Sequence, residues 1–121
     1  MLVLIIEDDA DLRETICEIL ESVPGVTSLG FASLEGLAAS GSIIDEAELA
    51  LLDVNLGAGQ PSGVDVHAWL RGRGFKGRSL FLTGHARAHP LVEQAFLVQD
   101  ARVMEKPVPI DTLVGLVRDG G

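Results

Sequence analysis

Carboxylates directly follow two short apolar segments of the sequence, and in that position they could bind a cation or act as a nucleophile. Glu7 and Asp8 come after the segment Leu2–Ile6, and Asp53 comes after Leu49–Leu52. Crowded carboxylates repel one another, and their pKa values rise unless a cation neutralises them. Oxygen ligands with no cysteine or histidine nearby favour a hard cation, and Mg²⁺ suits one or two carboxylates completed by water. These residues therefore predict a magnesium site.

A hydroxyl and an ammonium group follow two further apolar segments. Thr83 comes after Ser79–Leu82, and Lys106 follows Ala101–Met104 after one intervening residue. The charges of such a site balance, because Lys106 and Mg²⁺ offset the three carboxylates. A phosphoryl group that reached Asp53 would find the metal, the ammonium and the Thr83 hydroxyl available to its oxygens.

The apolar segments indicate the fold that must bring these side chains together. Strand-sized runs alternate with segments of helical spacing, and the runs are Leu2–Ile6, Thr27–Phe31, Leu49–Leu52, Ser79–Leu82 and Ala101–Met104. Continuous apolar runs are typical of parallel strands that are buried on both faces. We predict an α/β fold, a doubly wound five-stranded parallel sheet with helices on both faces. The carboxyl ends of the strands then share one edge, where ligands bind.

The predicted helices have recognisable first turns. Ser62, with Asp65 three positions later, is typical of a capping box, and Pro90 is favoured at a first helical position. A short helix is predicted over Ser33–Ala39, although Gly36 interrupts it. In the last two helices we expect the following residues to face inward: Leu91, Ala95, Val98, Ile110, Leu113, Val114 and Val117.

Length and composition favour one globular domain over residues 1–121. Apolar residues make up 47% and charged residues 22% of the chain, a ratio that excludes intrinsic disorder. The formal net charge of −9 argues against nucleic-acid binding, because phosphate backbones require clustered Lys and Arg. Cys17 is the only cysteine, so we expect no internal disulfide. With no apolar run long enough for a membrane span, we expect a cytoplasmic protein.

Four motifs resemble those of the receiver domain of bacterial two-component response regulators. In order along the chain they are LIIEDD, LLDVNL, LFLTGHA and MEKP, and each lies at the end of a predicted strand. The resemblance covers essentially the whole chain and implies a flavodoxin-like sheet with the strand order 2-1-3-4-5. It also implies that Asp53 is the phosphoacceptor, that Thr83 and Lys106 contact the phosphoryl group, and that the Lys106–Pro107 peptide bond is cis.

The same resemblance implies a signalling switch rather than a turnover enzyme. Mg²⁺ would be held by Glu7, Asp8 and Asp53 together with the backbone carbonyl of Asn55. A sensor histidine kinase or a histidine phosphotransfer protein would supply the phosphoryl group, and water would later remove it. Neither direct nucleic-acid binding nor contact with a membrane is expected.

Three features depart from the family pattern. Val103 stands three residues before Lys106, where receivers usually carry Tyr or Phe. A β-branched side chain has one preferred χ1 and does not swing between two states in the same way, so we expect an atypical readout. The loop 57–62 is longer than usual. Gln99 stands where glycine commonly closes the fourth helix, and we expect that turn to be rebuilt.

Other functions are compatible with the same architecture. A phosphorylation-independent protein-binding module with the receiver fold is the main alternative, and Val103 favours it. A magnesium-dependent phosphohydrolase of the haloacid-dehalogenase type usually carries a second Asp where this chain has Asn55. In a flavodoxin-like mononucleotide binder, Glu7, Asp8 and Asp9 would repel the phosphate. No G-x-G-x-x-G motif supports a dinucleotide site.

The remaining polar clusters predict ordinary surface. His85 and His89 lie four residues apart, but Pro90 disfavours helical geometry at His89 and no third ligand is near. We expect both, and likewise His67, to be exposed polar residues. The one basic cluster is expected in a solvated glycine-rich loop opposite the acidic edge, and its members are Arg71, Arg73, Lys76 and Arg78.

Overall fold

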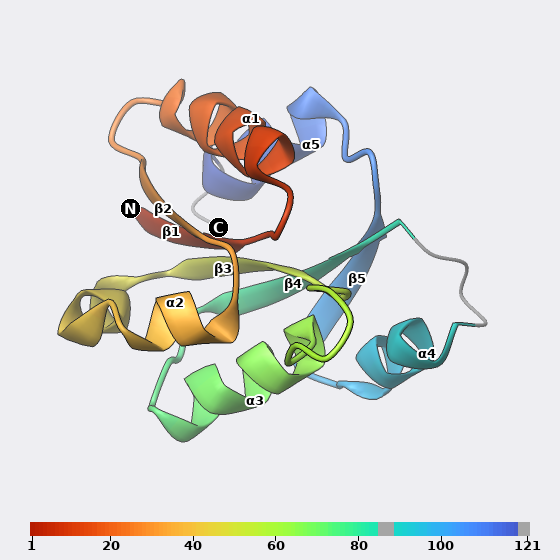
Figure 1. Ribbon diagram of the computed structural model, residues 1–121. Helices are drawn as coiled ribbons and strands as arrows, with labels where there is room; N and C mark the ends of the chain where they lie inside the picture. The colour runs from red at the N-terminus through yellow and green to blue at the C-terminus, as the bar shows by residue number, and fades with distance from the viewer. Residues whose placement is uncertain (85–88, 119–121) are drawn as a thin grey trace.

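A parallel sheet of five strands runs through the centre of the computed structural model, which describes residues 1–84 and 89–118 (Figure 1). The strands are β1 (Leu2–Ile6), β2 (Thr27–Phe31), β3 (Leu49–Asp53), β4 (Arg78–Thr83) and β5 (Ala101–Glu105). Every predicted strand is present, and β3, β4 and β5 are longer than predicted. Because β3 ends at Asp53 and β4 ends at Thr83, the sheet itself fixes the backbone of both residues.

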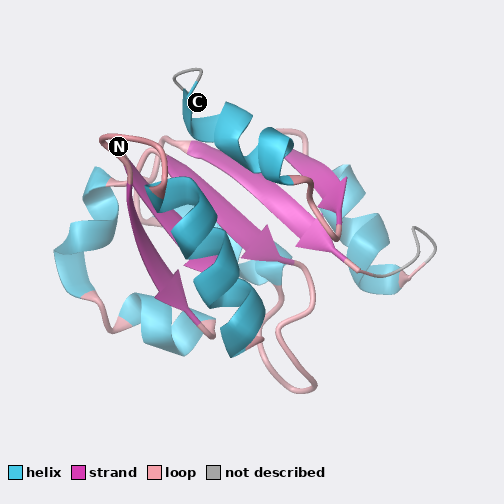
Figure 2. Cartoon of the chain, turned by 90° about the horizontal axis from the view of Figure 1, so that it is seen from above, coloured by secondary structure: helices cyan, strands magenta, loops and turns pink. Residues whose placement is uncertain are grey.

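Neighbouring strands pair in parallel in the order β2-β1-β3-β4-β5, which confirms the predicted strand order. Figure 2 shows the strands running in the same direction across the sheet. The register places Asp53 beside Leu82 and Thr83 beside Glu105. The last residues of β1, β3, β4 and β5 and the residues that follow them therefore gather at one edge, which we call the carboxyl edge.

Helices cover both faces of the sheet (Figure 1). One face carries α1 (Ala10–Glu21) and α5 (Ile110–Arg118), and the other carries α2 (Leu34–Ala38), α3 (Gly63–Gly72) and α4 (Pro90–Leu97). Within residues 1–84 and 89–118, no helix combines the length and the apolar character that crossing a membrane requires.

The strand β1 shows why the apolar runs are continuous. Val3 and Ile5 pack in the core under α1 and α5, whereas Leu4 and Ile6 pack in the core under the other helices. All four side chains are fully buried. Successive side chains of a strand point to opposite faces, so a strand covered on both faces needs apolar residues at every position.

Capping side chains set where α1 and α3 begin. The Asp9 carboxylate accepts hydrogen bonds from the backbone N–H groups of Asp11 and Leu12, so this side chain caps the start of α1. Ser62 and Asp65 form the predicted capping box of α3. Both caps lie next to the carboxyl edge and fix the connections that leave it.

Several details differ from the predictions for the helices. Ile110 is 62% exposed instead of facing inward, because it is the first residue of α5 and precedes the turn that packs on the sheet. In α4 the structure buries Val92, which was not predicted, together with Ala95, which was; Leu91 packs against the core as predicted but is only partly buried. A 3₁₀ helix over Gly41–Glu46, which the sequence did not predict, precedes β3.

The turn after α4 is rebuilt, as expected from Gln99. The helix ends at Leu97, and Val98 already has extended backbone geometry, with φ −75° and ψ 117°. No described residue other than glycine has a positive φ. The turn therefore does without the left-handed residue that glycine would supply.

A polar cluster at the opposite edge of the sheet corrects two further predictions. His67 is buried, not exposed, and its Nε2 lies 2.9 Å from Oδ1 of Asp100. The basic segment is paired rather than simply solvated, because Arg71 Nε donates to Asp100 Oδ2 at 2.9 Å and Arg73 Nε donates to Asp45 Oδ1 at 3.0 Å. The partners of these residues are about thirty positions away in the sequence, so local patterns could not reveal them.

Candidate functional site

The carboxyl edge brings the predicted acidic residues together. Asp53 ends β3, Glu7 and Asp8 follow β1, and one carboxylate oxygen from each lies within 4.8 Å of the others. Glu7 and Asp53 are 1% and 5% exposed, whereas Asp8 is exposed to solvent. Among the residues that the structure describes, no other group of three or more His, Cys, Asp or Glu side chains has the geometry to hold a metal ion.

Lys106 reaches the same carboxylates from the end of β5. Its Nζ lies 2.6 Å from Oε1 of Glu7 and 3.1 Å from Oδ1 of Asp53. The backbone N–H of Lys106 donates to the carbonyl oxygen of Thr83 at 2.7 Å, so the pairing of β4 and β5 continues for one more residue. The following Lys106–Pro107 peptide bond is cis, as the resemblance implied.

Burial and mutual contact shift the protonation of these groups. Burial, and then the hydrogen bond with Asp53, raises the pKa of Glu7. Burial also raises the pKa of Asp53, although Lys106 acts against it, and burial with the adjacent Glu7 raises the pKa of Asp8. Burial alone would lower the pKa of Lys106, but its contacts with Glu7 and Asp53 raise it. One ammonium group thus pairs with two of the three clustered carboxylates, and a divalent cation would relieve the remaining repulsion.

A surface cavity of about 320 Å³ opens over Asp53. It is lined by Asp8, Asp53, Asn55, Gly57, Ala58, Gly84 and Lys106. The donors at this cavity are oxygens, and two of the three clustered carboxylates border it. These residues therefore fit a hard divalent cation such as Mg²⁺ that keeps part of its water shell.

Asn55 and Thr83 occupy different places relative to the cavity. Asn55 lines it, and its side-chain Oδ1 accepts a hydrogen bond from the N–H of Gly57 at 3.0 Å, which fixes the start of the long loop. Thr83 is 1% exposed at the end of β4, and the next residue, Gly84, lines the cavity. The structure thus brings every predicted site residue to the carboxyl edge.

Sequence reasoning missed Gly63, the first residue of α3. A Cβ atom added there would overlap the carbonyl oxygen of Asp53 and lie 2.9 Å from its carbonyl carbon. The N–H of Gly63 donates to the carbonyl oxygen of Val54 at 3.0 Å. The start of α3 therefore packs directly on the backbone that carries Asp53. A glycine directly after the capping Ser62 was the signal that could have indicated this contact.

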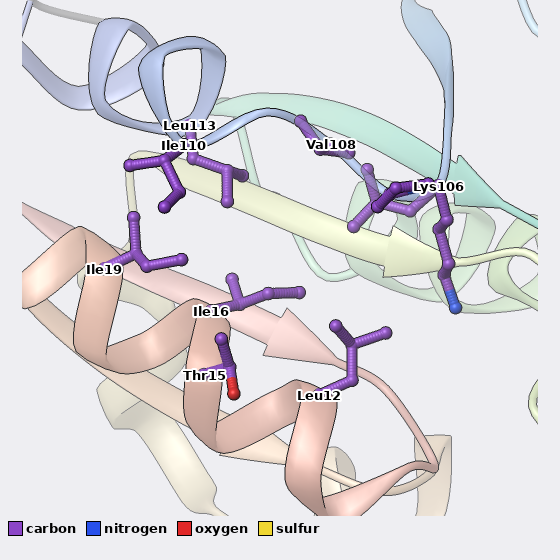
Figure 3. Close-up of a pocket in the computed structure, with 10 residues that line it drawn as sticks. Leu12, Thr15, Ile16, Ile19, Lys106, Val108, Ile110 and Leu113 are labelled. Atoms are coloured by element: carbon purple, nitrogen blue, oxygen red, sulfur yellow. The ribbon is translucent and has the colours of Figure 1, made fainter.

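An apolar groove between α1 and α5 lies beside the site (Figure 3). Its volume is about 470 Å³, and its lining consists of Leu12, Thr15, Ile16, Ile19, Leu82, Lys106, Pro107, Val108, Ile110 and Leu113. Figure 3 shows Lys106 at the end nearest Leu12, while Ile19 and Ile110 face each other at the other end. The exposed Ile110 thus borders a groove instead of filling the core.

The histidines considered as metal ligands take no part in the described acidic cluster. His89 accepts a hydrogen bond at Nδ1 from the N–H of Leu91 and so caps α4, while His67 lies at the opposite edge of the sheet. His85 lies outside the described residues.

Comparison of the sequence with protein-family models and with curated proteins gives no match. The structure, however, is similar to a response regulator receiver protein from Pseudoalteromonas atlantica, with a TM-score of 0.81 and 24% identity. The match covers 98% of this chain and 95% of that chain. This chain has the response regulator receiver fold.

Further solved structures agree with the receiver fold. A CheY-like receiver domain protein from Methanospirillum hungatei matches with a TM-score of 0.78 at 20% identity, over 98% of this chain and 91% of that chain. The receiver domain of NtrX from Brucella abortus matches with a TM-score of 0.77 at 20% identity, over 97% and 95% of the two chains. This chain also matches a longer NtrX structure over 98% of its own length but over only 26% of that chain, so the receiver fold there is joined to further domains.

Proposed function

We propose that this protein is a two-component receiver that accepts a phosphoryl group on Asp53 with the help of Mg²⁺. The observation that carries the proposal is the position of Lys106, whose Nζ lies 2.6 Å from Glu7 and 3.1 Å from Asp53, beside a cluster of three carboxylates. The receiver fold supports the same function. The donor would be the phosphohistidine of a sensor histidine kinase or of a histidine phosphotransfer protein.

The side chains of the site have distinct roles in the proposed transfer. A carboxylate oxygen of Asp53 attacks the phosphorus in line, the P–N bond of the donor breaks, and its electron pair returns to the imidazole. The product is an acyl phosphate on Asp53. Lys106 and the Thr83 hydroxyl donate hydrogen bonds to phosphoryl oxygens as negative charge redistributes. Water later hydrolyses the acyl phosphate to inorganic phosphate and the free carboxylate.

Glu7, Asp8, Asp53 and the backbone carbonyl of Asn55 would hold the cation. Mg²⁺ bound there supplies positive charge that offsets both the carboxylates and the incoming phosphoryl oxygens. The chain modifies itself once per cycle, so we assign it as a switch rather than a turnover enzyme. A kinase-dependent switch with one unpaired cysteine, Cys17, suits the cytoplasm.

A second candidate function is a phosphorylation-independent binding module with the receiver fold. Val103 favours it, because it occupies the usual aromatic switch position and packs as a partly buried side chain against the core under α2, α3 and α4. A short β-branched side chain offers one preferred rotamer there, so it does not supply the usual rotameric readout.

Titration with beryllofluoride and Mg²⁺ distinguishes the two functions. Beryllofluoride mimics a phosphoryl group on a carboxylate, so the receiver function predicts saturable changes in the backbone amide NMR signals of Thr83, Gly84 and Lys106. Asp53→Asn, which keeps the side-chain shape, should abolish them. A wild-type spectrum that does not respond would contradict phosphate acceptance and favour the binding module.

A further inference from the structure

Arg13 connects α1 to the backbone that carries the acidic pair. Its Nη1 donates a hydrogen bond of 2.7 Å to the carbonyl oxygen of Glu7. The backbone N–H of Glu7 donates to the carbonyl oxygen of Phe31 on β2 at 2.9 Å. The two peptide groups that flank Glu7 are therefore held independently, one by the side chain of α1 and the other by β2.

Gly30 on β2 leaves the space that the Arg13 side chain needs. A Cβ atom on Gly30 would lie 2.9 Å from Cγ and 3.0 Å from Cδ of Arg13, a separation that real side chains avoid. Gly30 does not have a positive φ, so its backbone geometry does not require glycine. Glycine within a strand weakens the strand and marks places of close approach. The close approach here is made by the aliphatic part of Arg13.

The position of the Glu7 peptide matters because two carboxylates depend on it. Glu7 itself contacts Lys106, and Asp8 is the next residue along the chain. A hydrogen bond from a guanidinium group to a carbonyl is charge-assisted and stronger than a neutral one. Mg²⁺ requires near-ideal ligand positions, so a small shift of this peptide would displace two ligands at once.

We propose that Arg13 is a positioning residue for the divalent-cation site. Through the carbonyl group of Glu7 it sets the positions of the carboxylates of Glu7 and Asp8, and Gly30 provides the space across which its side chain reaches them. This inference rests on the proposed function, because it takes Glu7 and Asp8 as metal ligands.

Calorimetric titration of the full chain with Mg²⁺ tests this role in four variants: Arg13→Gln, Arg13→Lys, Gly30→Ala and the double variant Arg13→Gln/Gly30→Ala. Removing a partner that orients a metal ligand typically costs ten- to a hundredfold in affinity, so we expect Arg13→Gln to raise the Kd about tenfold. Arg13→Lys keeps a cationic donor and should recover part of the affinity. Gly30→Ala displaces Arg13 and should raise the Kd by a smaller factor.

The double variant separates this role from general destabilisation. Because Gly30→Ala acts through Arg13, it should have no further effect on the Kd once Arg13 is Gln, whereas independent effects would multiply. In the metal-free protein, the amide NMR signals of Glu7 and Asp8 should shift in Arg13→Gln and in Gly30→Ala. Urea unfolding without metal shows whether each variant is folded.

The same measurements can overturn the inference as a whole or in part. A folded Arg13→Gln variant with the wild-type Kd would exclude a positioning role for Arg13. Multiplied effects in the double variant would exclude the contribution of Gly30. If the wild type binds Mg²⁺ and no variant differs from it, only this inference fails. If the wild type binds no Mg²⁺, the proposed function fails as well.

Discussion

Lys106 lies closer to Glu7 than to Asp53, at 2.6 Å against 3.1 Å. The two contacts hold the ammonium group between the carboxylates and raise its pKa, although burial alone would lower it. A phosphoryl group on Asp53 would therefore compete with Glu7 for the same donor. Glu7 thus both holds Lys106 and contributes an oxygen to the cluster of three carboxylates.

The raised pKa of Asp53 predicts that neutralising this side chain stabilises the metal-free fold. Burial, the largest cause, disfavours the ionised form of Asp53, so the native state binds its proton more tightly than the unfolded state does. Stability from such a group falls as the pH rises through the raised pKa. We expect Asp53→Asn to increase the free energy of unfolding by about 1 kcal/mol at neutral pH without divalent ions. Urea unfolding measures this, with the exposed Glu46→Gln as a control that should change little.

Removing the lysine should have the opposite effect. Its raised pKa means that Lys106 contributes stability below its ordinary value of 10.5, and this contribution is lost only as the pH rises through the raised value. Lys106→Met leaves the buried carboxylates unpaired, so we expect the free energy of unfolding at neutral pH to fall by about 2 kcal/mol. The deficit should shrink as the pH is lowered and the carboxylates protonate. A variant as stable as the wild type in metal-free urea titrations would contradict these ion pairs.

At the scale of elements, Gly63 determines how closely α3 approaches β3. A Cβ atom at this position overlaps the carbonyl oxygen of Asp53, and backbone atoms cannot move aside as a flexible side chain can. We expect Gly63→Ala to lower the free energy of unfolding by about 1–3 kcal/mol.

Gly72 in the same helix is the matched control. Nothing lies within 4 Å of a Cβ atom added there. Because alanine has the higher helix propensity, Gly72→Ala should raise the free energy of unfolding by about 0.5–1 kcal/mol. Chemical denaturation of both variants compares the two sites. Equal effects at Gly63 and Gly72 would exclude a close contact between α3 and β3.

Asp100 joins α3 to the turn before β5. The hydrogen bond from His67, and then the contact with Arg71, lowers the pKa of Asp100, so its contribution to stability is present above the ordinary value of 3.8 and is lost as the pH falls through the lowered value. The Asp100 side chain is 57% exposed, which limits the contribution to about 0.5–1 kcal/mol. We expect Asp100→Asn to lower the free energy of unfolding by this amount at neutral pH and to leave it unchanged in strong acid. A loss that persists in strong acid would show that the carboxylate charge is not its cause.

The elements differ in how far local sequence could predict them. The buried strands were predictable because they are covered on both faces and so are apolar at each position, as β1 shows. Ile110 was misplaced because helical periodicity does not show that the first residue of α5 borders an open groove instead of the core. His67 was taken as exposed because its partner, Asp100, is 33 residues away.

At the scale of the whole molecule, the parallel sheet explains why residues so far apart in sequence form one site. Glu7 and Lys106 are 99 positions apart, yet both follow strands that end at the carboxyl edge. The sequence placed these residues at strand ends, and the topology rule for parallel sheets brought them together. The contact of Arg13 with the Glu7 carbonyl had no signal in the local sequence, and the glycine after Ser62 was the one local sign of the contact at Gly63, because both contacts depend on a close approach to another element.

The mass of the intact protein after incubation with acetyl phosphate tests the central claim most directly. Acetyl phosphate supplies the phosphoryl group without any partner protein, so the result depends on this chain alone. We predict that the wild type gains the mass of one phosphoryl group only when Mg²⁺ is present, that the control Asp111→Asn gains the same mass, and that Asp53→Asn gains none. A wild type that stays unmodified with Mg²⁺, or an Asp53→Asn variant modified as fully as the wild type, would contradict the assignment of Asp53 as phosphoacceptor.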